Sequence, residues 1–276
     1  MAIVNPRLLI KNLADYAAIS ASPSLIPSLL ETYLQMPARN KTARTTSLAS
    51  QDIKLSWAAD QRVNMVALRY HNLTTSAQLR VRTYTDSAWT TGLIDNAAAN
   101  CFAYTGLSDK VDLLDPDFRI FKNSPRYFTL ATNVRSMIIT VIDPTNPDGY
   151  MDFSRLFVGE YWEFAYGAPY NNAPVSFGDM SVQGRSDSGN IVTDKRGRYV
   201  IAGINPEFIT MAADYKELAA AAMSLGLSKD FWFSTYPKEG TILEMYNQNA
   251  YKFTSIPTMD RDMPGSMKSQ IKMEST

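Results

Sequence analysis

The sequence has one cysteine, Cys101, and one histidine, His71, among 276 residues. A single cysteine excludes a disulfide within the chain and any cluster of thiolate metal ligands. We interpret Cys101 as a small apolar filler, because no basic neighbour in the sequence would activate its thiol. His71 is the one imidazole available as a general base, and no GxSxG nucleophile motif accompanies it. We therefore predict that His71 bonds a loop backbone at the end of a strand.

Net charge and long apolar runs are also missing. Lys plus Arg equals Asp plus Glu at 27 each, so no overall field favours nucleic acid or an anionic membrane. The sequence has no run of 18 or more apolar residues, so it predicts no membrane-spanning helix. The N-terminal residues lack the basic start and cleavage site of a signal peptide, which favours folding in a reducing cytoplasm. With 45% hydrophobic and 20% charged residues, the composition is that of a folded protein.

Sequence motifs for cofactors and metals are absent as well. Without a phosphate loop or a dinucleotide fingerprint, no cofactor is expected. Asp112, Asp115 and Asp117 are closely spaced, but the Gly and Glu of a calcium-binding EF-hand loop are not in place, so they predict a solvated turn. Asp143 and Asp148 flank a Pro/Gly turn, where carboxylates commonly bond the backbone. Any two acids can meet in a glycosidase site, but nothing here favours that. We expect no enzyme.

Alternating apolar and polar residues predict strands between residues 53 and 143. Ile53–Trp57 and Gln78–Tyr84 alternate, Val63–Tyr70 is more uniformly apolar, and Tyr127–Ala131 and Met137–Ile142 form a late pair. Before them, residues 1–50 contain four prolines and predict an arm that wraps its own domain or a neighbour, or a flexible leader. Such strands with short turns indicate an antiparallel sandwich or jelly roll in residues 1–150.

Residues 151–276 predict a second β-rich domain with one helix. Asn205 and Pro206 are suited to begin a helix, an apolar stripe from Phe208 to Leu225 continues it, and Gly226 ends it. A hairpin is expected around the tip 195–197, with a flexible loop at 184–189. The tail after Pro257 is polar and is expected to fray unless a neighbour orders it. Further strands are predicted at 156–163, 182–183, 191–194, 198–204, 232–235, 243–246 and 252–255.

Six residues are candidates for an interface. Basic residues on a hairpin can contact DNA or an acidic partner, although a solvated turn is the more frequent explanation. Tyr and Trp near the domain junction favour a core or a subunit interface, because aromatic rings give large contact areas, over a sugar-stacking site. The candidates are Trp162, Tyr166, Tyr170, Lys195, Arg196 and Arg198.

Two stretches resemble a known group of folds. Val63–Leu73 followed by Ala77–Arg82 is similar to a strand-turn-strand of the discoidin-like, galactose-binding-type jelly rolls carried by tailed-phage proteins, with Trp57 and Asp60 before it. Arg126–Phe128 through Asn146–Tyr150 and Gly159 resembles the end of the same domain. In the C-terminal half, Ser186, Gly189, the basic hairpin to Arg198 and the helix from Pro206 resemble the β-sandwich plus helix of tail-tube and distal-tail proteins.

This resemblance implies a structural subunit of a siphophage tail tip or baseplate. It implies a virion protein that forms a homo-oligomeric ring, with a hexamer as the expected order, and that contacts the tail tube, hub and tape-measure proteins. DNA would pass through the channel only in transit. The family supplies no catalytic residues to carry over. Two rival hypotheses remain open: a carbohydrate-binding module for host glycan, and a glycan hydrolase, although the long β-helical repeats of such tail enzymes are missing.

Overall fold

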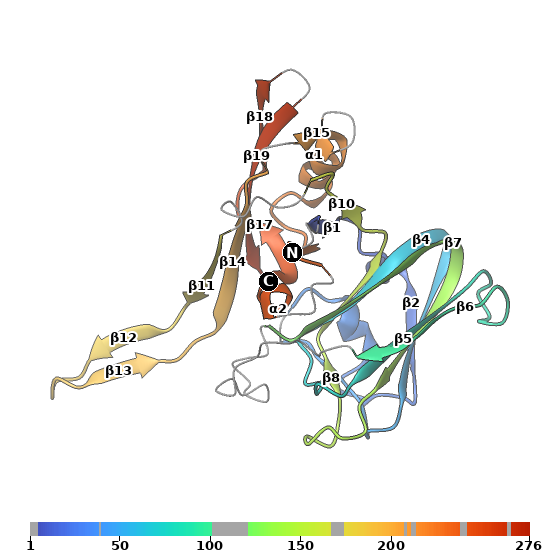
Figure 1. Cartoon of the computed structure of the whole chain (residues 1–276). Coiled ribbons are helices and arrows are strands. Elements are labelled where there is room, and N and C mark those ends of the chain that lie inside the picture. The colour runs from blue at the N-terminus through green and yellow to red at the C-terminus, as the bar shows by residue number, and fades with distance from the viewer. Residues whose placement is uncertain are drawn as a thin grey trace.

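A computed structural model describes residues 5–38, 40–100, 121–166, 174–206, 209–210, 214–237, 242–263 and 266–276. The protein is mainly β, as predicted, and these residues form two large antiparallel sheets and two short α-helices. Figure 1 shows the N-terminal sheet beside the C-terminal one, and a thin ribbon that projects from the latter. No helix in the described parts of the chain is long and apolar enough to span a membrane.

The N-terminal sheet has six strands in the order β2-β4-β7-β5-β6, with β9 also paired to β4. Two of its strands are much longer than predicted, because each merges two of the expected runs through bulges in the β4–β7 register. Asn133, between the two runs that β7 merges, lies within this strand with a positive φ of 60°. The strands are β2 (Ala18–Ser22), β4 (Gln51–Arg69), β5 (Gln78–Tyr84), β6 (Ile94–Asn100), β7 (Asn123–Ile142) and β9 (Arg155–Gly159).

Segments on both sides of β2 in the sequence cover this sheet. They contain two 3-10 helices, η1 (Leu13–Tyr16) and η2 (Glu31–Gln35), and strand β3 (Ala43–Arg44), which pairs with β8 (Asp152–Phe153). Their apolar side chains share one buried core with the inward residues of β4, β5 and β7. These described segments therefore pack on the N-terminal sheet.

The C-terminal sheet has nine strands, with the path β10-β1-β16-β17-β19-β14-β11 and with β15 and β18 both paired to β19. Helix α1 (Asp214–Leu225) packs on it through Leu218, Ala221 and Leu225. Gly226, with φ +53°, follows the helix as predicted. The strands are β1 (Arg7–Leu9), β10 (Trp162–Glu163), β11 (Val175–Asp179), β14 (Arg198–Ile204), β15 (Ile209–Thr210), β16 (Phe231–Ser234), β17 (Gln248–Phe253), β18 (Thr258–Met263) and β19 (Ser266–Ser275).

Three local predictions in this half differ from the structure. The helix begins at Asp214 rather than Pro206, because residues 209–210 pair with β19 and the buried Asp214 carboxylate accepts hydrogen bonds from Thr210. Residues 243–246, predicted as a strand, lie in the short helix α2 (Ile242–Tyr246). The polar tail does not fray: β19 lies between β17 and β14 near the centre of the sheet.

The two halves are joined by an apolar cluster. Leu9 and Trp232 from the C-terminal sheet pack with Met65, Ala67 and Phe157 from β4 and β9. Trp232 is fully buried, and its ring centroid lies 5.9 Å from that of Phe157. The division at residue 150 stays a prediction, since strands cross it both ways: β1 belongs to the C-terminal sheet and β9 to the N-terminal one.

Two buried arginines add polar contacts at the same junction. Arg155 on β9 donates to both carboxylate oxygens of Asp230 at 2.9 Å and to Asp15 at 2.9 Å. Arg69 on β4 donates to the Asn249 side chain at 3.1 Å and to Thr276. Each arginine therefore links the N-terminal sheet to the C-terminal half through side chains that are almost inaccessible to water.

Candidate functional site

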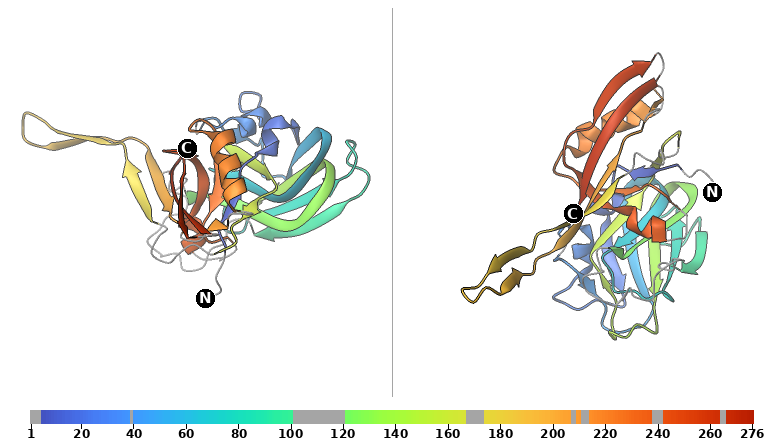
Figure 2. Two further views of the ribbon diagram at one scale, coloured as in Figure 1. Left: turned by 90° about the horizontal axis from the view of Figure 1, so that it is seen from above. Right: turned by 60° about the vertical axis from the view of Figure 1, so that its left-hand side comes forward.

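The projecting ribbon is the first candidate surface. It consists of residues 180–197, called the arm below, and contains β12 (Val182–Arg185) paired with β13 (Ile191–Asp194). Every residue of both strands is exposed. Figures 1 and 2 show the arm extending away from the rest of the molecule, so that nothing in the described chain covers either of its faces.

A β-bulge sets the direction of the arm. Asp179 pairs with Arg198, but the next pair is Val182 with Asp194, so two residues on one strand face three on the other. The Met180 N–H donates to the Gly197 carbonyl at 3.2 Å across this bulge. A bulge bends a ribbon and increases its twist. The tip predicted at 195–197 is therefore this bulge, and the true tip is the turn 186–190, with Gly189 at φ +83°.

The arm has two different faces, because paired residues point to the same side. Val182 and Val192 lie on one face together with Gly184, which adds no side chain, so this face is flat and apolar apart from Asp194. Arg185 and Ile191 lie on the opposite, more polar face. The exposed apolar side chains of the arm are Met180 (53%), Val182 (53%), Ile191 (62%) and Val192 (58%).

Aromatic side chains hold the base of the arm in place. The ring of Tyr199 on β14 covers Gly178 on β11 so closely that a Cβ at residue 178 would lie 2.2 Å from Cζ of the ring. Phe177 packs edge-on against Phe121 and Tyr246, with centroids 5.5 and 6.1 Å away. The arm thus starts from a fixed position on the sheet.

The three basic interface candidates lie at the bulge. Arg196 Nε donates to Asp194 at 2.9 Å and Arg198 Nε donates to Asp179 at 3.3 Å, while Lys195 directly precedes Arg196 in the sequence. These pairs are exposed, so they contribute little to stability. They leave the charges of the arm nearly balanced, which disfavours the DNA-binding alternative.

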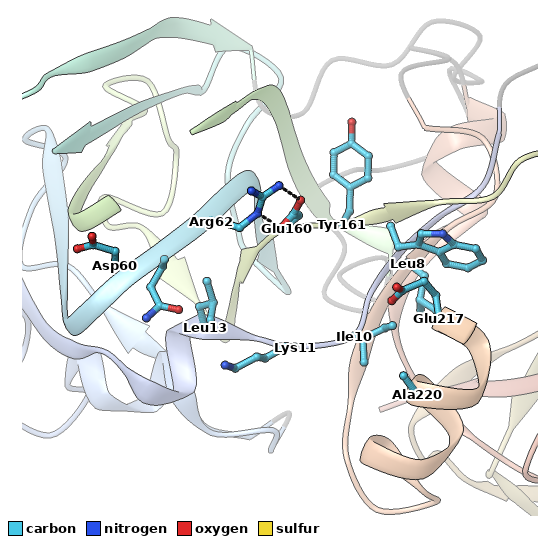
Figure 3. Close-up of a pocket in the computed structure, with 12 residues that line it drawn as sticks. Leu8, Ile10, Lys11, Leu13, Asp60, Arg62, Glu160, Tyr161, Glu217 and Ala220 are labelled. Atoms are coloured by element: carbon cyan, nitrogen blue, oxygen red, sulfur yellow. Dashed lines mark hydrogen bonds and ion pairs between the residues drawn. The ribbon is translucent and has the colours of Figure 1, made fainter. Parts of the chain in front are cut away.

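A cleft of about 570 Å³ is the second candidate surface. It lies between the two halves, where β4 bulges and α1 approaches the link between β9 and β10 (Figure 3). Its apolar lining comes from Leu8, Ile10, Leu13, Trp162 and Ala220. Its polar lining comes from Lys11, Asp60, Gln61, Arg62, Glu160, Tyr161 and Glu217.

One ion pair crosses the rim of the cleft. Arg62 donates two hydrogen bonds to the Glu160 carboxylate, at 2.7 and 2.9 Å, as the dashed lines in Figure 3 mark. The hydrogen bond from Arg62 lowers the pKa of Glu160 below its usual value. Glu217 lies on α1 at the other side of the cleft, and among the described residues it has no hydrogen bond or ion pair.

The aromatic candidates have different environments. Trp162 lines the cleft and also packs on Phe164, with centroids 4.1 Å apart, so it serves the core as well. Tyr166 is exposed, and Tyr170 lies outside the described residues. The structure therefore places Trp162 in the cleft, Lys195 and Arg196 on the arm and Arg198 at the base of the arm, and does not bring the aromatic and basic groups together within one chain.

The candidate catalytic groups have structural roles. His71 is fully buried, accepts at Nδ1 from the Leu73 N–H at 3.2 Å, and bonds Ser124 Oγ through Nε2 at 2.6 Å, as predicted for a loop contact. Asp143 accepts from the Thr74 N–H at 2.9 Å, and Asp148 accepts from Asn72 at 2.7 Å. Cys101, Asp112, Asp115 and Asp117 lie outside the described residues. Within the described ranges, no group of three or more His, Cys, Asp or Glu could hold a metal ion.

No protein-family model matches the sequence, and no curated protein matches it. Similar solved structures are carbohydrate-binding jelly-roll modules. The Clostridium perfringens module CpGH89CBM32-5, in complex with GalNAc-β-1,3-galactose, is 12% identical over 54% of this chain and 100% of its own, with a TM-score of 0.39. The family 32 module of Clostridium perfringens NanJ, in complex with galactose, is 12% identical over 56% and 99%, with a TM-score of 0.38.

A chitosan-binding module from a Paenibacillus sp. IK-5 chitosanase/glucanase is similar to the same degree. It is 15% identical over 54% of this chain and 99% of its own, with a TM-score of 0.38. All three likenesses concern about half of this chain. With TM-scores below 0.5, they carry no inference about what this chain binds. The resemblance to phage tail proteins finds no counterpart among these structures.

Proposed function

We propose that this protein is a structural subunit that assembles with other copies of itself through the arm. The observation that carries the proposal is an exposed two-stranded ribbon with apolar side chains on its surface. An isolated two-stranded ribbon is only marginally stable in water. Contiguous exposed apolar surface commonly marks a protein interface. Both facts favour an arm that is covered in the working assembly.

The open C-terminal sheet favours a ring as the form of this assembly. Its two ends, β10 and β11, are different surfaces, so a contact that uses both is heterologous. Heterologous contacts generate closed rings when the rotation between copies closes, and filaments when it does not. A ring agrees with the sequence resemblance to tail-tip proteins, on which the finer proposal rests: a subunit of a siphophage tail tip, in a ring of expected order six, between the tail tube and the receptor-binding apparatus. The proposal assigns no catalytic role.

The mass of the purified protein in solution tests the proposal. We expect a discrete oligomer by light scattering and native mass spectrometry, and a shift to monomer when Val192→Asp places a charge on the apolar face of the arm. Leu93→Asp is the matched control, because Leu93 is also exposed (53%) but lies in the β5–β6 loop of the other sheet. A monomer at all concentrations, or an equal effect of both substitutions, would contradict assembly through the arm.

The second candidate function is binding of a host glycan, and the cleft is the observation that favours it. Trp162 offers an aromatic ring there, and Lys11, Asp60 and Glu217 offer hydrogen-bonding groups around it. The galactose-containing ligands named for the similar modules suggest which glycans to try first. We expect, on this hypothesis, binding to a glycan array that Trp162→Ala abolishes and that Val192→Asp leaves unchanged. No binding at millimolar galactose or GalNAc-β-1,3-galactose would remove this candidate.

A further inference from the structure

We infer that the arm of one copy docks into the cleft of the next copy, with the Val182/Val192 face against the apolar lining. This inference rests on the proposed function, because it names the surface that covers the arm. The sheet carries the cleft at one end, beside β10, and the arm at the other, after β11. The six interstrand steps between these ends span about 29 Å at ~4.8 Å each. Because the arm also points away from the body, it cannot reach its own cleft (Figures 1 and 2).

The apolar surfaces of the two sites match. Ile10 and Ala220 are accessible in the cleft between its charged rims, with the buried Leu8 beneath them, and the volume of about 570 Å³ is within the range of ligand sites. The arm is slender and presents Val182 and Val192 on a face that Gly184 keeps flat. Burial of these side chains would remove from water the apolar surface that the arm exposes in the single chain.

The charges of the two surfaces are complementary. The cleft has three acids and two bases: Asp60, Glu160 and Glu217 against Lys11 and Arg62. The arm and its two flanking residues have four bases and three acids: Arg185, Lys195, Arg196 and Arg198 against Asp179, Asp187 and Asp194.

One charge of the cleft remains for a contact between copies. Among the described residues Glu217 has no ionic partner, and it lies at the side of the cleft formed by α1. We therefore place Glu217 against the net positive arm of the next copy, whereas Arg185, on the face opposite Val182 and Val192, points away from this contact.

The size of the contact fits a closed ring better than a dimer. The arm supplies fewer residues than the roughly 20–30 per side of a standard interface, so one arm in one cleft is a weak contact. In a closed ring each copy gives one arm and receives another, so every copy makes two such contacts. Closure makes the last contact intramolecular and raises the stability of the whole.

Cysteine cross-linking of the full chain tests the docking. In a Cys101→Ser background, Val192→Cys protein is mixed with Ala220→Cys protein under mild oxidation, and we expect a disulfide-linked heterodimer. Thr193→Cys is the matched control, because Thr193 neighbours Val192 but lies on the opposite face of the arm. Linked dimers of Val192→Cys alone would indicate arm-to-arm contact and would overturn the inference.

A charge reversal tests the same contact without new cysteines. We expect Glu217→Arg, which changes the net charge of the cleft from −1 to +1, to weaken assembly about tenfold, and Glu217→Gln to weaken it by a smaller factor. An oligomer that persists with neither cross-link nor charge dependence overturns arm-to-cleft docking but leaves the proposed function standing. A monomer throughout overturns both.

Discussion

Removing the charge of Arg155 should destabilise the junction between the two halves. The Arg155 side chain is 2% exposed and lies between Asp230, 6% exposed, and Asp15, 33% exposed. Burial disfavours its charge, but the hydrogen bonds and negative charges of the two acids outweigh this and raise the pKa of Arg155. Arg155→Met keeps most of the apolar stem and leaves two carboxylates without their cation. Breaking a buried ion pair in this way costs about 3–5 kcal/mol.

Most of that cost should come from Asp230, because Asp15 is partly hydrated and its contribution is screened. The expected loss is a large share of the ~5–15 kcal/mol that stabilises a typical domain. Urea denaturation followed by circular dichroism and by tryptophan fluorescence would measure it. If the junction weakens more than either half, the unfolding transitions reported by the two probes will no longer coincide, because unfolding is then no longer two-state.

The triple variant Arg155→Met/Asp15→Asn/Asp230→Asn is the control for the cause. It removes the uncompensated charges, so we expect it to recover at least half of the loss. A triple variant less stable than Arg155→Met would refute the electrostatic explanation. It would indicate that the shape of the guanidinium, which also donates to the Gln35 carbonyl, matters more than its charge.

The pH dependence gives a second check on the same site. Burial raises the pKa of Asp15 above 3.8, and the hydrogen bond from Arg155 opposes this shift. A raised acid pKa contributes stability that is present below the unfolded value and is lost as the pH rises through the folded value. Without Arg155 the opposing effect disappears, so the cost of Arg155→Met should be larger at pH 7 than at pH 4. Equal costs at both pH values would contradict this account.

Two further predictions concern the base of the arm and the cleft. Gly178→Val should displace the Tyr199 ring and destabilise the folded protein by about 1–3 kcal/mol, which a lower melting temperature would report. In the control Gly184→Val the new side chain meets no atom within 4 Å, so the melting temperature should not change. Equal melting temperatures for both variants would show that the Tyr199 ring moves without cost. The hydrogen bond from Arg62 lowers the pKa of Glu160. The Glu160 carboxylate therefore contributes stability above about pH 4.5, and this stability is lost as the pH falls through the lowered pKa. Because the pair is exposed, Glu160→Gln should change unfolding by under ~1 kcal/mol at pH 7, and an effect that 0.5 M salt does not reduce would contradict the assignment.

The strands of the N-terminal sheet were predictable because their alternation is strong. Ile53, Leu55 and Trp57 all face the core, as period-two patterning requires. The pattern could not show that Ile53–Trp57 and Val63–Tyr70 belong to one bent strand, because a bulge replaces the expected turn. In the same way a bulge at 195–197 has the turn-forming residues of a hairpin tip, and the sequence prediction put the tip there.

The misplaced elements in the C-terminal half have tertiary causes. The Ile271–Ser275 segment alternates buried and exposed residues, a signal that its polar composition obscured. Pairing of β15 with β19 delays the start of α1, and no local propensity encodes that contact. The junction arginines were not predictable at all, because Arg69 and Asn249 lie 180 residues apart and an arginine in an apolar run has no partner in the sequence. The cleft is formed by the same distant segments, so only Trp162 among its residues was a candidate.

In the proposed assembly, the junction between the two halves sets the position of the arm relative to the cleft of the same copy. A closed ring requires a fixed rotation between neighbouring copies, and small rotational errors produce open helices instead. In this chain the cleft contains residues from both halves, while the arm continues from one sheet edge. Their relative position is therefore defined by the contacts that join the halves. These contacts are the apolar cluster around Trp232 and the hydrogen bonds of Arg69 and Arg155. We therefore expect Arg155→Met to broaden the distribution of oligomers in native mass spectrometry even where both arm and cleft are intact. An unchanged single oligomer would show that the arm alone determines the geometry.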